Sequence, residues 1–348
     1  MGARTAPDQT VQGVLAVLAG TPLRQAAADI GMDPTDLADA AEVYRTAGHA
    51  ALEAQADTHG WYQVRVQFAD WDAAEHVAAT RLAPELRQAQ NAGVLAGWWF
   101  IRKAPYWRLR CQTGPAVTAA DLRVAMCTVL DGLTGAGLVG RWWETVYEPE
   151  VCAFGGPEGM AVAHDLFHAD SVGVLDYMRR QDPASPAEGI IGRRELSVVL
   201  CSALFRRAGQ EWHEQGDVWH RVAQMRPLPP KMPTDRLSDM AADLQRLLAV
   251  DAGPTSALFG TGGPLAFAAP WAVAFDEAGR GLATAAREGT LQRGVRDVLA
   301  HHVIFHWNRL GLAARTQGIL AWAACDTVMN PPGSVPALES RRADVGGA

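Results

Sequence analysis

The sequence has few cysteines, and no two of them are closely spaced. Their number is odd, their separations are wide, and no Cys-x-x-Cys pair occurs, which excludes a dense disulfide framework and a cysteine-based structural zinc site. The N-terminus also lacks the pattern of a signal peptide. We therefore expect a reduced, cytoplasmic protein. The five cysteines are Cys111, Cys127, Cys152, Cys201 and Cys325.

Lysine is almost absent, and basic residues do not outnumber acidic ones. Lys103 and Lys231 are the only lysines among the 31 basic residues. The sequence has 38 acidic residues, so its formal net charge is −7. An acidic chain without a basic patch is a poor candidate for binding nucleic acid or an anionic membrane. We expect neither as a partner.

No hydrophobic run of membrane-spanning length is free of interruption. Residues 252–275 are uncharged, but Pro254, Pro264 and Pro270 break them up, together with four glycines. Proline inside a helix removes a hydrogen bond and kinks or ends the helix. The pattern predicts a buried loop that ends in a proline-started helix near Trp271.

Residues 1–58 have an all-helical pattern that resembles a helix-turn-helix, with a glycine at the turn and Asp33-Pro34 before the next helix. Three arginines face eight acidic residues in this segment, a net charge of 3 − 8 = −5, which argues against DNA binding. Two interpretations stay open: a small packing module, or a docking module for a leader peptide.

From Trp61 onward the periodicity changes. Alternating and amphipathic stretches predict strand, helix, strand, strand, helix and strand at 61–68, 72–91, 97–102, 106–111, 119–135 and 138–147. This order is that of a ferredoxin-like antiparallel sheet with two helices on one face. Helical patterns then fill 159–179, 191–225, 235–249, 270–287 and 291–325. We expect an α+β fold with one domain over 59–330 and a disordered tail at 331–348.

The last helical pattern carries an unusual set of polar residues. His302, His306 and Arg309 stand three or four residues apart beside an apolar stripe, so they share one face of the helix. Polar groups beside a buried stripe need partners. They are either satisfied core residues or parts of a functional site.

Two histidines at 164 and 168 suggest a metal site, because their spacing on a helix resembles that of zinc proteases. His302 and His306 offer a second pair. However, Asp165 stands where zinc proteases have glutamate, and no third ligand lies at a suitable spacing. We expect no metal, and hydrogen-bonded histidines instead.

Arginines on the central strands suggest a binding site for a carboxylate or a polarised carbonyl. Arg108 and Arg110 project from one face of their strand, and Arg102 comes from the strand before. The alternative is a solvated face on which nearby glutamates, at 144, 148 and 150, pair with the arginines.

Six short motifs follow one another in order between residues 60 and 325. They are Phe100-Ile101-Arg102, Arg108-Leu109-Arg110, Tyr147-Glu148-Pro149-Glu150, Phe154-Gly155-Gly156, His164-x-x-Phe167-x-x-Asp170-Ser171 and His306-x-Asn308-Arg309-Leu310. As an ordered set they resemble one family, the glutamate-elimination domain of lantibiotic dehydratases. Its standalone relatives, the thiopeptide pyridine synthases, are the most similar. The chain departs from the eliminating enzymes at Ala153, where they carry a catalytic arginine before the Gly-Gly turn.

This resemblance implies a formal aza-[4+2] cycloaddition between two dehydroalanines of a modified precursor peptide. Loss of water and expulsion of the leader peptide then leave a pyridine, with no cofactor and no metal. The partner would be the precursor peptide, comprising its leader and its azole-bearing core. The implied catalytic residues are His306, Arg309, Tyr147, Asp170 and Ser171, and the implied substrate-binding residues are Arg102, Arg108, Arg110, Trp99, Phe154, Asn308 and His302.

Two other functions remain open. The absence of arginine at Ala153 is compatible with an inactive, leader-binding partner of a split lantibiotic dehydratase. The two histidine pairs are compatible with a helical metalloenzyme.

Overall fold

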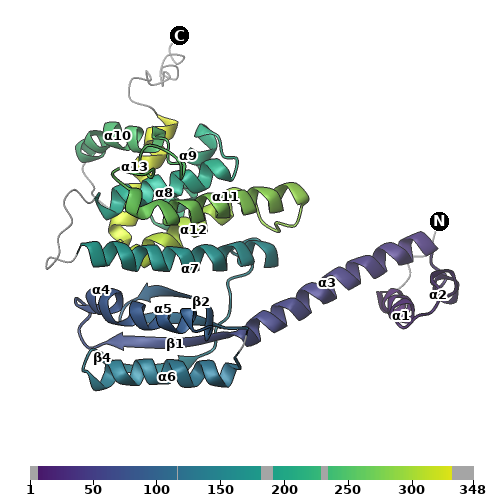
Figure 1. The fold of residues 1–348 in the computed structure, drawn as a ribbon. Helices are drawn as coiled ribbons and strands as arrows, with labels where there is room; N and C mark the ends of the chain where they lie inside the picture. Colours follow the sequence, from purple (N-terminus) through teal and green to yellow (C-terminus); the bar gives the residue numbers. More distant parts are fainter. Residues whose placement is uncertain (1–6, 116, 182–190, 229–233, 331–348) are drawn as a thin grey trace, which may run out of the picture. The chain divides into compact units, whose positions relative to one another are not determined.

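The computed structural model describes residues 7–115, 117–181, 191–228 and 234–330 (Figure 1). The chain divides into two compact units, residues 1–60 and 61–348. The larger unit belongs to the mixed α+β class, because a small four-stranded antiparallel sheet is followed by many helices. The tail expected at 331–348 lies outside the described residues.

The sheet forms where the sequence alternates between apolar and polar residues. Its strands stand in the order β2-β3-β1-β4, and every neighbouring pair is antiparallel. Because side chains alternate between faces, one face carries Val64, Leu109 and Cys111, and the other carries Arg65, Arg108 and Arg110. We call the second one the arginine face. The strands are β1 (Trp61–Phe68), β2 (Leu95–Lys103), β3 (Tyr106–Thr113) and β4 (Val139–Thr145).

The helices that connect β1 to β2 and β3 to β4 cover the face opposite the arginine face. The helix between β3 and β4 is α6 (Ala119–Gly135), which begins in a capping box between Thr118 and Asp121. On this helix the Met126 sulfur lies 3.8 Å from the Cys111 sulfur of β3. The segment between β1 and β2 was expected as one continuous helix. It is instead α4 (Ala74–Val77), a π-helical turn (Ala78–Leu82) and α5 (Ala83–Asn91), since Pro84 has no N–H with which to continue the α-helical bonds.

The free edge of β2 is closed by side chains of α7 (Pro157–Arg180). Ser171 Oγ accepts a hydrogen bond from the Phe100 N–H at 3.1 Å, and the His168 ring nitrogen Nδ1 lies 2.8 Å from the Trp98 carbonyl oxygen. An edge strand otherwise exposes a row of unpaired backbone groups. These contacts place α7 directly beside the sheet, as Figure 1 also shows.

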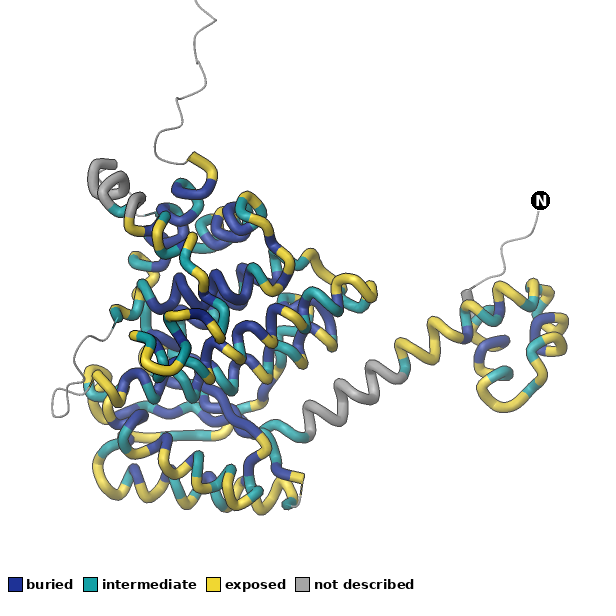
Figure 2. Tube along the Cα trace, turned by 45° about the horizontal axis from the view of Figure 1, so that its top comes forward, coloured by how far each residue is buried: buried dark blue, intermediate teal, exposed yellow. Residues whose placement is uncertain are grey.

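The helices that follow α7 in the chain lie above it in Figure 1, on the side away from the sheet. Figure 2 shows that most of the buried chain lies within this half, and α8 is buried continuously from residue 196 to residue 205. A helix that is apolar on all sides occupies the centre of a core. The bounds are α8 (Arg193–Arg207), α9 (Trp212–Met225), α10 (Thr234–Ala249), α11 (Ala269–Glu288), α12 (Val295–Leu310) and α13 (Ala314–Met329).

The stretch 252–275 is mostly irregular, as expected, but it is only partly buried and not the buried loop that the sequence suggested. A short 3₁₀ helix (Ala266–Ala268) leads into α11, which has Pro270 in its first turn. Across the described ranges, no helix is both long enough and apolar enough to cross a membrane.

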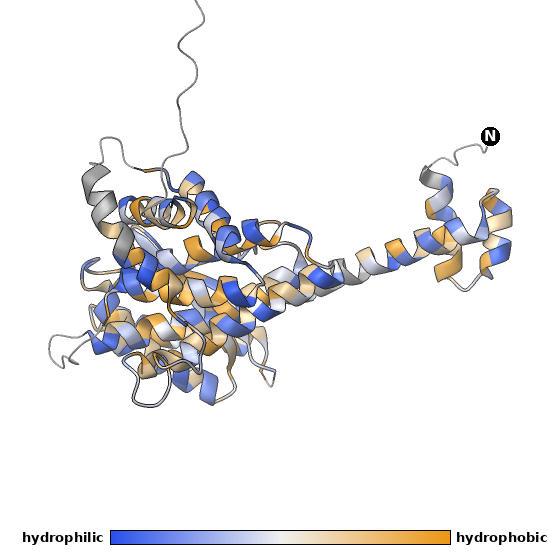
Figure 3. Cartoon of the chain, turned by 90° about the horizontal axis from the view of Figure 1, so that it is seen from above, coloured by the Kyte–Doolittle hydropathy of each residue, from blue (hydrophilic) through white to orange (hydrophobic). Residues whose placement is uncertain are grey.

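The smaller unit contains three helices, α1 (Pro7–Leu18), α2 (Leu23–Ile30) and α3 (Pro34–Gly60). Gly31 ends α2 in the left-handed region (φ 67°), and its N–H bonds to the last turn of the helix. The core is small, with Val14, Ala27 and Leu37 at its centre. Apolar and polar residues are interspersed along α3 (Figure 3), and several large apolar side chains stay exposed, among them Leu15 and Val43.

Candidate functional site

A fully buried carboxylate connects three helices. Asp170 of α7 accepts hydrogen bonds from Trp271 Nε1 of α11 at 2.9 Å and from His306 Nδ1 of α12 at 2.8 Å. Its second oxygen accepts a bond from Arg309 Nε at 2.7 Å. Burial alone would raise the pKa of Asp170, but the adjacent His306 and Arg309 outweigh it and lower that pKa to about 2. Asp170 is therefore ionised at neutral pH.

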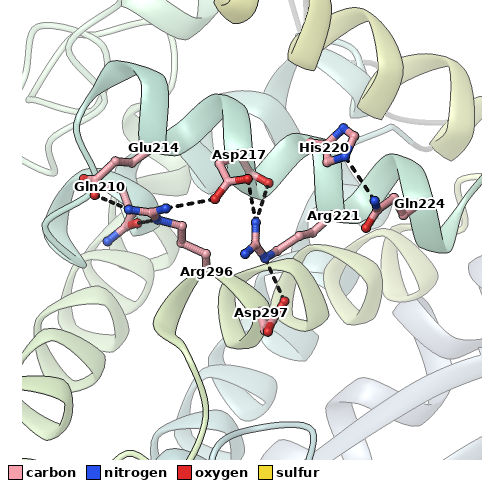
Figure 4. A network of polar contacts seen from close by, with 8 residues as sticks. All are labelled: Gln210, Glu214, Asp217, His220, Arg221, Gln224, Arg296 and Asp297. Atoms are coloured by element: carbon pink, nitrogen blue, oxygen red, sulfur yellow. Dashed lines mark hydrogen bonds and ion pairs between the residues drawn. The ribbon is translucent and has the colours of Figure 1, made fainter.

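The helix that carries His306 and Arg309 is held at both ends. Its first turn joins a charged network with α9 (Figure 4), in which Arg296 pairs with Asp217 at 2.9 Å and with Glu214. Arg221 of α9 meets Asp297 of α12 at 2.7 Å in the same network. Because Arg309 in the last turn is held by Asp170, α12 has a fixed position against α7.

Aromatic rings enclose the stripe that the sequence predicted on α12. His302, His306 and Arg309 are each at most 2% exposed. The Phe154 ring contacts His302 edge-on at 4.9 Å between centroids, and the rings of Phe167 and Phe305 stack at 5.0 Å. Burial, and next the Arg309 charge, lowers the pKa of His302 to about 3, so this imidazole is neutral.

The turn that places Phe154 requires two glycines. Gly155 and Gly156 have φ values of 85° and 101°, which side chains rarely allow. The Gly155 carbonyl oxygen accepts a hydrogen bond from the Gln292 N–H at 2.7 Å, which ties the turn to the segment before α12. The Gly-Gly pair therefore positions the aromatic ring and starts α7.

A second group of polar residues surrounds Arg110 on β3. Its guanidinium lies 4.0 Å from the Trp99 ring and 4.6 Å from the Tyr147 ring, and its Nε donates to Gln63 Oε1 at 2.7 Å. Its Nη1 is buried and has no hydrogen-bond partner among the described residues. Burial lowers the pKa of Arg110 to about 10, so the charge is kept at neutral pH.

Tyr147 and His164 form a pair beside Arg110. The Tyr147 hydroxyl lies 2.8 Å from His164 Nε2. Burial lowers the pKa of His164 to about 4 and raises that of Tyr147 above its usual value. At neutral pH the pair is therefore uncharged, and the phenol and the imidazole share one hydrogen bond.

The two groups meet at Trp99. Its ring contacts the Arg110 guanidinium, and it lies 5.9 Å from the Arg309 guanidinium, which also covers the Phe167 ring at 4.4 Å. The structure thus brings together eight of the predicted residues, namely Trp99, Arg110, Tyr147, Phe154, Asp170, His302, His306 and Arg309.

Three predicted residues have partners outside these groups. Arg102 lies on the other face of the sheet, where it pairs with Glu75. Asn308 accepts a hydrogen bond from Gln317 Nε2 at 3.1 Å, and Ser171 supports the edge of β2. Arg108 lies on the arginine face next to Arg110, as predicted.

The histidines that suggested a metal have other contacts. His164 bonds to Tyr147, and His168 bonds to the β2 backbone and lies 3.2 Å from Gln90 Nε2. In the part of the chain that the structure describes, no group of three or more histidine, cysteine, aspartate or glutamate side chains could hold a metal ion.

Sequence reasoning missed three neighbours of these groups. Gln63 and Arg65 could have been found, because alternation along 61–68 places both on one strand face. Trp271 carries no such signal, since its contact with Asp170 joins residues that are 101 positions apart.

Comparison with solved structures shows that the fold is shared. The tRNA-dependent lantibiotic dehydratase MibB from Microbispora sp. 107891 is 19% identical over 77% of this chain, with a TM-score of 0.57, and this chain spans only 28% of MibB. The pyridine synthase TbtD from thiomuracin biosynthesis is 15% identical over 77% of this chain and 97% of its own, with a TM-score of 0.56. TsrL is 16% identical, with a TM-score of 0.47 over 77% of this chain and 94% of its own.

Among curated proteins, none matches this sequence. The profile of the lantibiotic biosynthesis dehydratase C-terminal family, however, matches residues 61–328, which contain the whole sheet and the buried carboxylate described above. This chain therefore belongs to the lantibiotic biosynthesis dehydratase C-terminal family.

Proposed function

We propose that this protein is a thiopeptide pyridine synthase. Two dehydroalanines of a precursor peptide, with the intervening amide as its iminol tautomer, would close a six-membered ring. Loss of water and of the leader peptide as a carboxamide would then give a pyridine without net oxidation or reduction. The similarity to TbtD along 97% of that chain and the alanine at position 153 support synthesis over glutamate elimination.

The environment of Arg110 is the observation that carries this proposal. A guanidinium held between two aromatic rings, with a buried N–H left over, is preorganised to bind a carbonyl or iminol oxygen. Stabilising the iminol is the demand that this reaction places on a charged donor. The aromatic rings of Trp99 and Tyr147 would in addition pack against an azole of the substrate.

We assign the proton transfer nearest the substrate to Tyr147, with His164 as its hydrogen-bond partner. The Tyr147–His164 pair lies beside Arg110, whereas His306 is hydrogen-bonded to Asp170. Asp170, His306 and Arg309 would act by fixing Trp99 and Phe167, the wall of the site. Holding the reacting groups in the right geometry can lower the barrier by roughly 7–11 kcal/mol. One general acid or base typically accelerates a reaction by about 10²–10⁴-fold, which is a smaller contribution.

The finer assignments of fold and partner belong to the same proposal. The strand order β2-β3-β1-β4 supports a ferredoxin-like arrangement. The partner would be the precursor peptide, with residues 1–58 as the docking module for its leader. The apolar side chains exposed on α1 and α3 support that role.

The test is to incubate the purified protein with a dehydrated, azole-containing linear precursor and to follow the products by mass spectrometry. The expected products are a macrocycle that has lost water and the leader, and a free leader carboxamide. A precursor with one dehydroalanine replaced by alanine should give neither. Tight leader binding without any product would favour the inactive binding partner, and activity that chelation abolishes would favour the metalloenzyme.

A further inference from the structure

Two arginines on the arginine face lie directly opposite each other. Arg65 of β1 and Arg108 of β3 are paired in register, so their Cβ atoms are about 4.5–5.5 Å apart. Both side chains are half-buried, and the Nε of Arg65 is buried with no hydrogen-bond partner among the residues that the structure describes. Like charges in this position destabilise a sheet unless an anion lies between them.

Among the side chains that the structure describes, none next to the pair supplies that anion. The other cross-strand partners are Trp143 for Arg65 and Ile101 for Arg108. Within the described ranges, no carboxylate lies within 4 Å of either guanidinium. The Glu150 charge offsets part of the lowering of the Arg110 pKa, but its buried Oε2 has no hydrogen-bond partner among the described residues.

The surroundings of the pair make it reachable by a peptide. Arg110 and Gln63 next to it are buried, whereas Lys103 and Arg141 further along the face are exposed. The pair thus lies at the boundary between the covered and the open part of the sheet. Beside it, the rings of Tyr106 and Trp143 meet edge-on at 4.8 Å, and both are half-buried.

We propose that Arg65 and Arg108 together bind the side-chain carboxylate of an acidic residue in a peptide. One carboxylate bridging two guanidiniums would replace their repulsion by charge-assisted hydrogen bonds, and the aromatic pair would hold an apolar neighbour of the acidic residue. We expect this peptide to be the precursor, and that identification alone rests on the proposed function. The carboxylate site itself does not depend on cyclisation.

The binding test uses two blocked tetrapeptides, one with a glutamate next to a tryptophan and one with glutamine in its place. Binding is measured on the full-length protein by titrating the arginine Nε–H signals in NMR spectra. We expect the glutamate peptide to bind about tenfold more tightly, and added salt to reduce the difference. Equal affinity of the two peptides would overturn the proposal.

Variants separate this site from a structural role. Arg65→Gln should abolish the preference for glutamate, Arg65→Lys should keep part of it, and Arg123→Gln, on α6 at the opposite face, should keep all of it. Without peptide, Arg65→Gln should raise the midpoint of thermal unfolding, because it removes a repulsion. A lowered midpoint together with an unchanged preference would show that Arg65 is only structural.

The outcome is independent of the cyclisation assay. If no pyridine forms but the glutamate preference is lost in Arg65→Gln, the proposed function fails and the carboxylate site stands. If pyridine forms and neither peptide is preferred, only the carboxylate site fails.

Discussion

Asp170 and Arg309 form an ion pair that water does not reach. Arg309 Nε lies 2.7 Å from Asp170 Oδ2, and the side chains are 1% and 0% exposed. A buried pair gains its stability only when both partners are present, because each charge has lost its hydration. The same carboxylate also accepts bonds from His306 and Trp271. Its loss would therefore affect three helices at once.

Replacing the buried carboxylate should strongly destabilise the protein. We expect Asp170→Asn to lower the free energy of unfolding by about 3–5 kcal/mol, because the Arg309 charge stays buried without a counter-charge. Urea denaturation measures the change. The matched control is Asp176→Asn on the same helix, whose pair with Arg87 is more than a third exposed on the aspartate side and should contribute less than about 1 kcal/mol. Equal effects of the two variants would contradict this interpretation.

Stability should fall as the pH decreases from neutral, and His302 should cause part of that loss. Its pKa is about 3 in the folded protein and about 6.5 when unfolded, so the unfolded chain binds more protons between these values. The stability from neutral His302 is complete above pH 6.5 and decreases below it by about 1.4 kcal/mol per pH unit. His302→Leu should reduce this slope in urea titrations between pH 6.5 and pH 4.5.

His164 acts in the same direction, since its pKa is also lowered, so some slope should remain in the His302→Leu variant. Asp170 adds a separate loss. Its pKa of about 2 lies below the unfolded value near 3.9, so its contribution is present above pH 4 and disappears as the pH falls toward 2. An unchanged slope in His302→Leu would mean that this imidazole is not held neutral.

The Arg110 site should distinguish arginine from lysine. Arg110→Lys keeps the charge but loses the planar group that lies against Trp99 and Tyr147 and bonds to Gln63. We expect kcat/KM for pyridine formation to drop about 10–10³-fold. Product mass spectrometry measures the rate, with circular dichroism as the check on folding. Turnover at the wild-type rate would place the site elsewhere.

Deleting residues 1–60 should weaken leader binding without unfolding the rest. Residues 61–348 form a compact unit with the main hydrophobic core, so the thermal unfolding of the truncated protein should remain cooperative. Calorimetry with the isolated leader peptide measures the affinity. Identical affinities with and without the module would leave a packing role for these helices.

Much of the fold could be predicted because its elements have clear periods. Alternation predicted the four strands, and the 3.6-residue period predicted helical segments after Pro149, although the stretches 191–225 and 291–325 each contain two helices. The π-helical turn at 78–82 was not predictable from that period, because Pro84 alters the hydrogen bonding locally while the apolar pattern continues. The pairing of β2 with β3 follows from the short turn between them, whereas the pairings of β1 with β3 and with β4 depend on contacts that no local window contains.

The site was predictable to the extent that it lies on single elements. The stripe His302, His306 and Arg309 follows from spacing on one helix. Arg102 was grouped with Arg108 and Arg110 as a substrate-binding residue, although the two-residue turn at 104–105 implies that it aligns with Trp107 and not with Arg108. Trp271 donates its hydrogen bond to Asp170 only because tertiary packing brings the two residues together, so no sequence pattern predicts this contact.

The contacts that close the edge of β2 also matter before the protein is complete. During synthesis the β2–β3 hairpin emerges well before α7, and until then the backbone of Trp98 and Phe100 is open to pairing with another chain. Once α7 has folded against the sheet, His168 and Ser171 form hydrogen bonds with these backbone groups. We therefore expect these two side chains to limit pairing with other chains while the protein folds, independently of any chemistry that the folded protein performs.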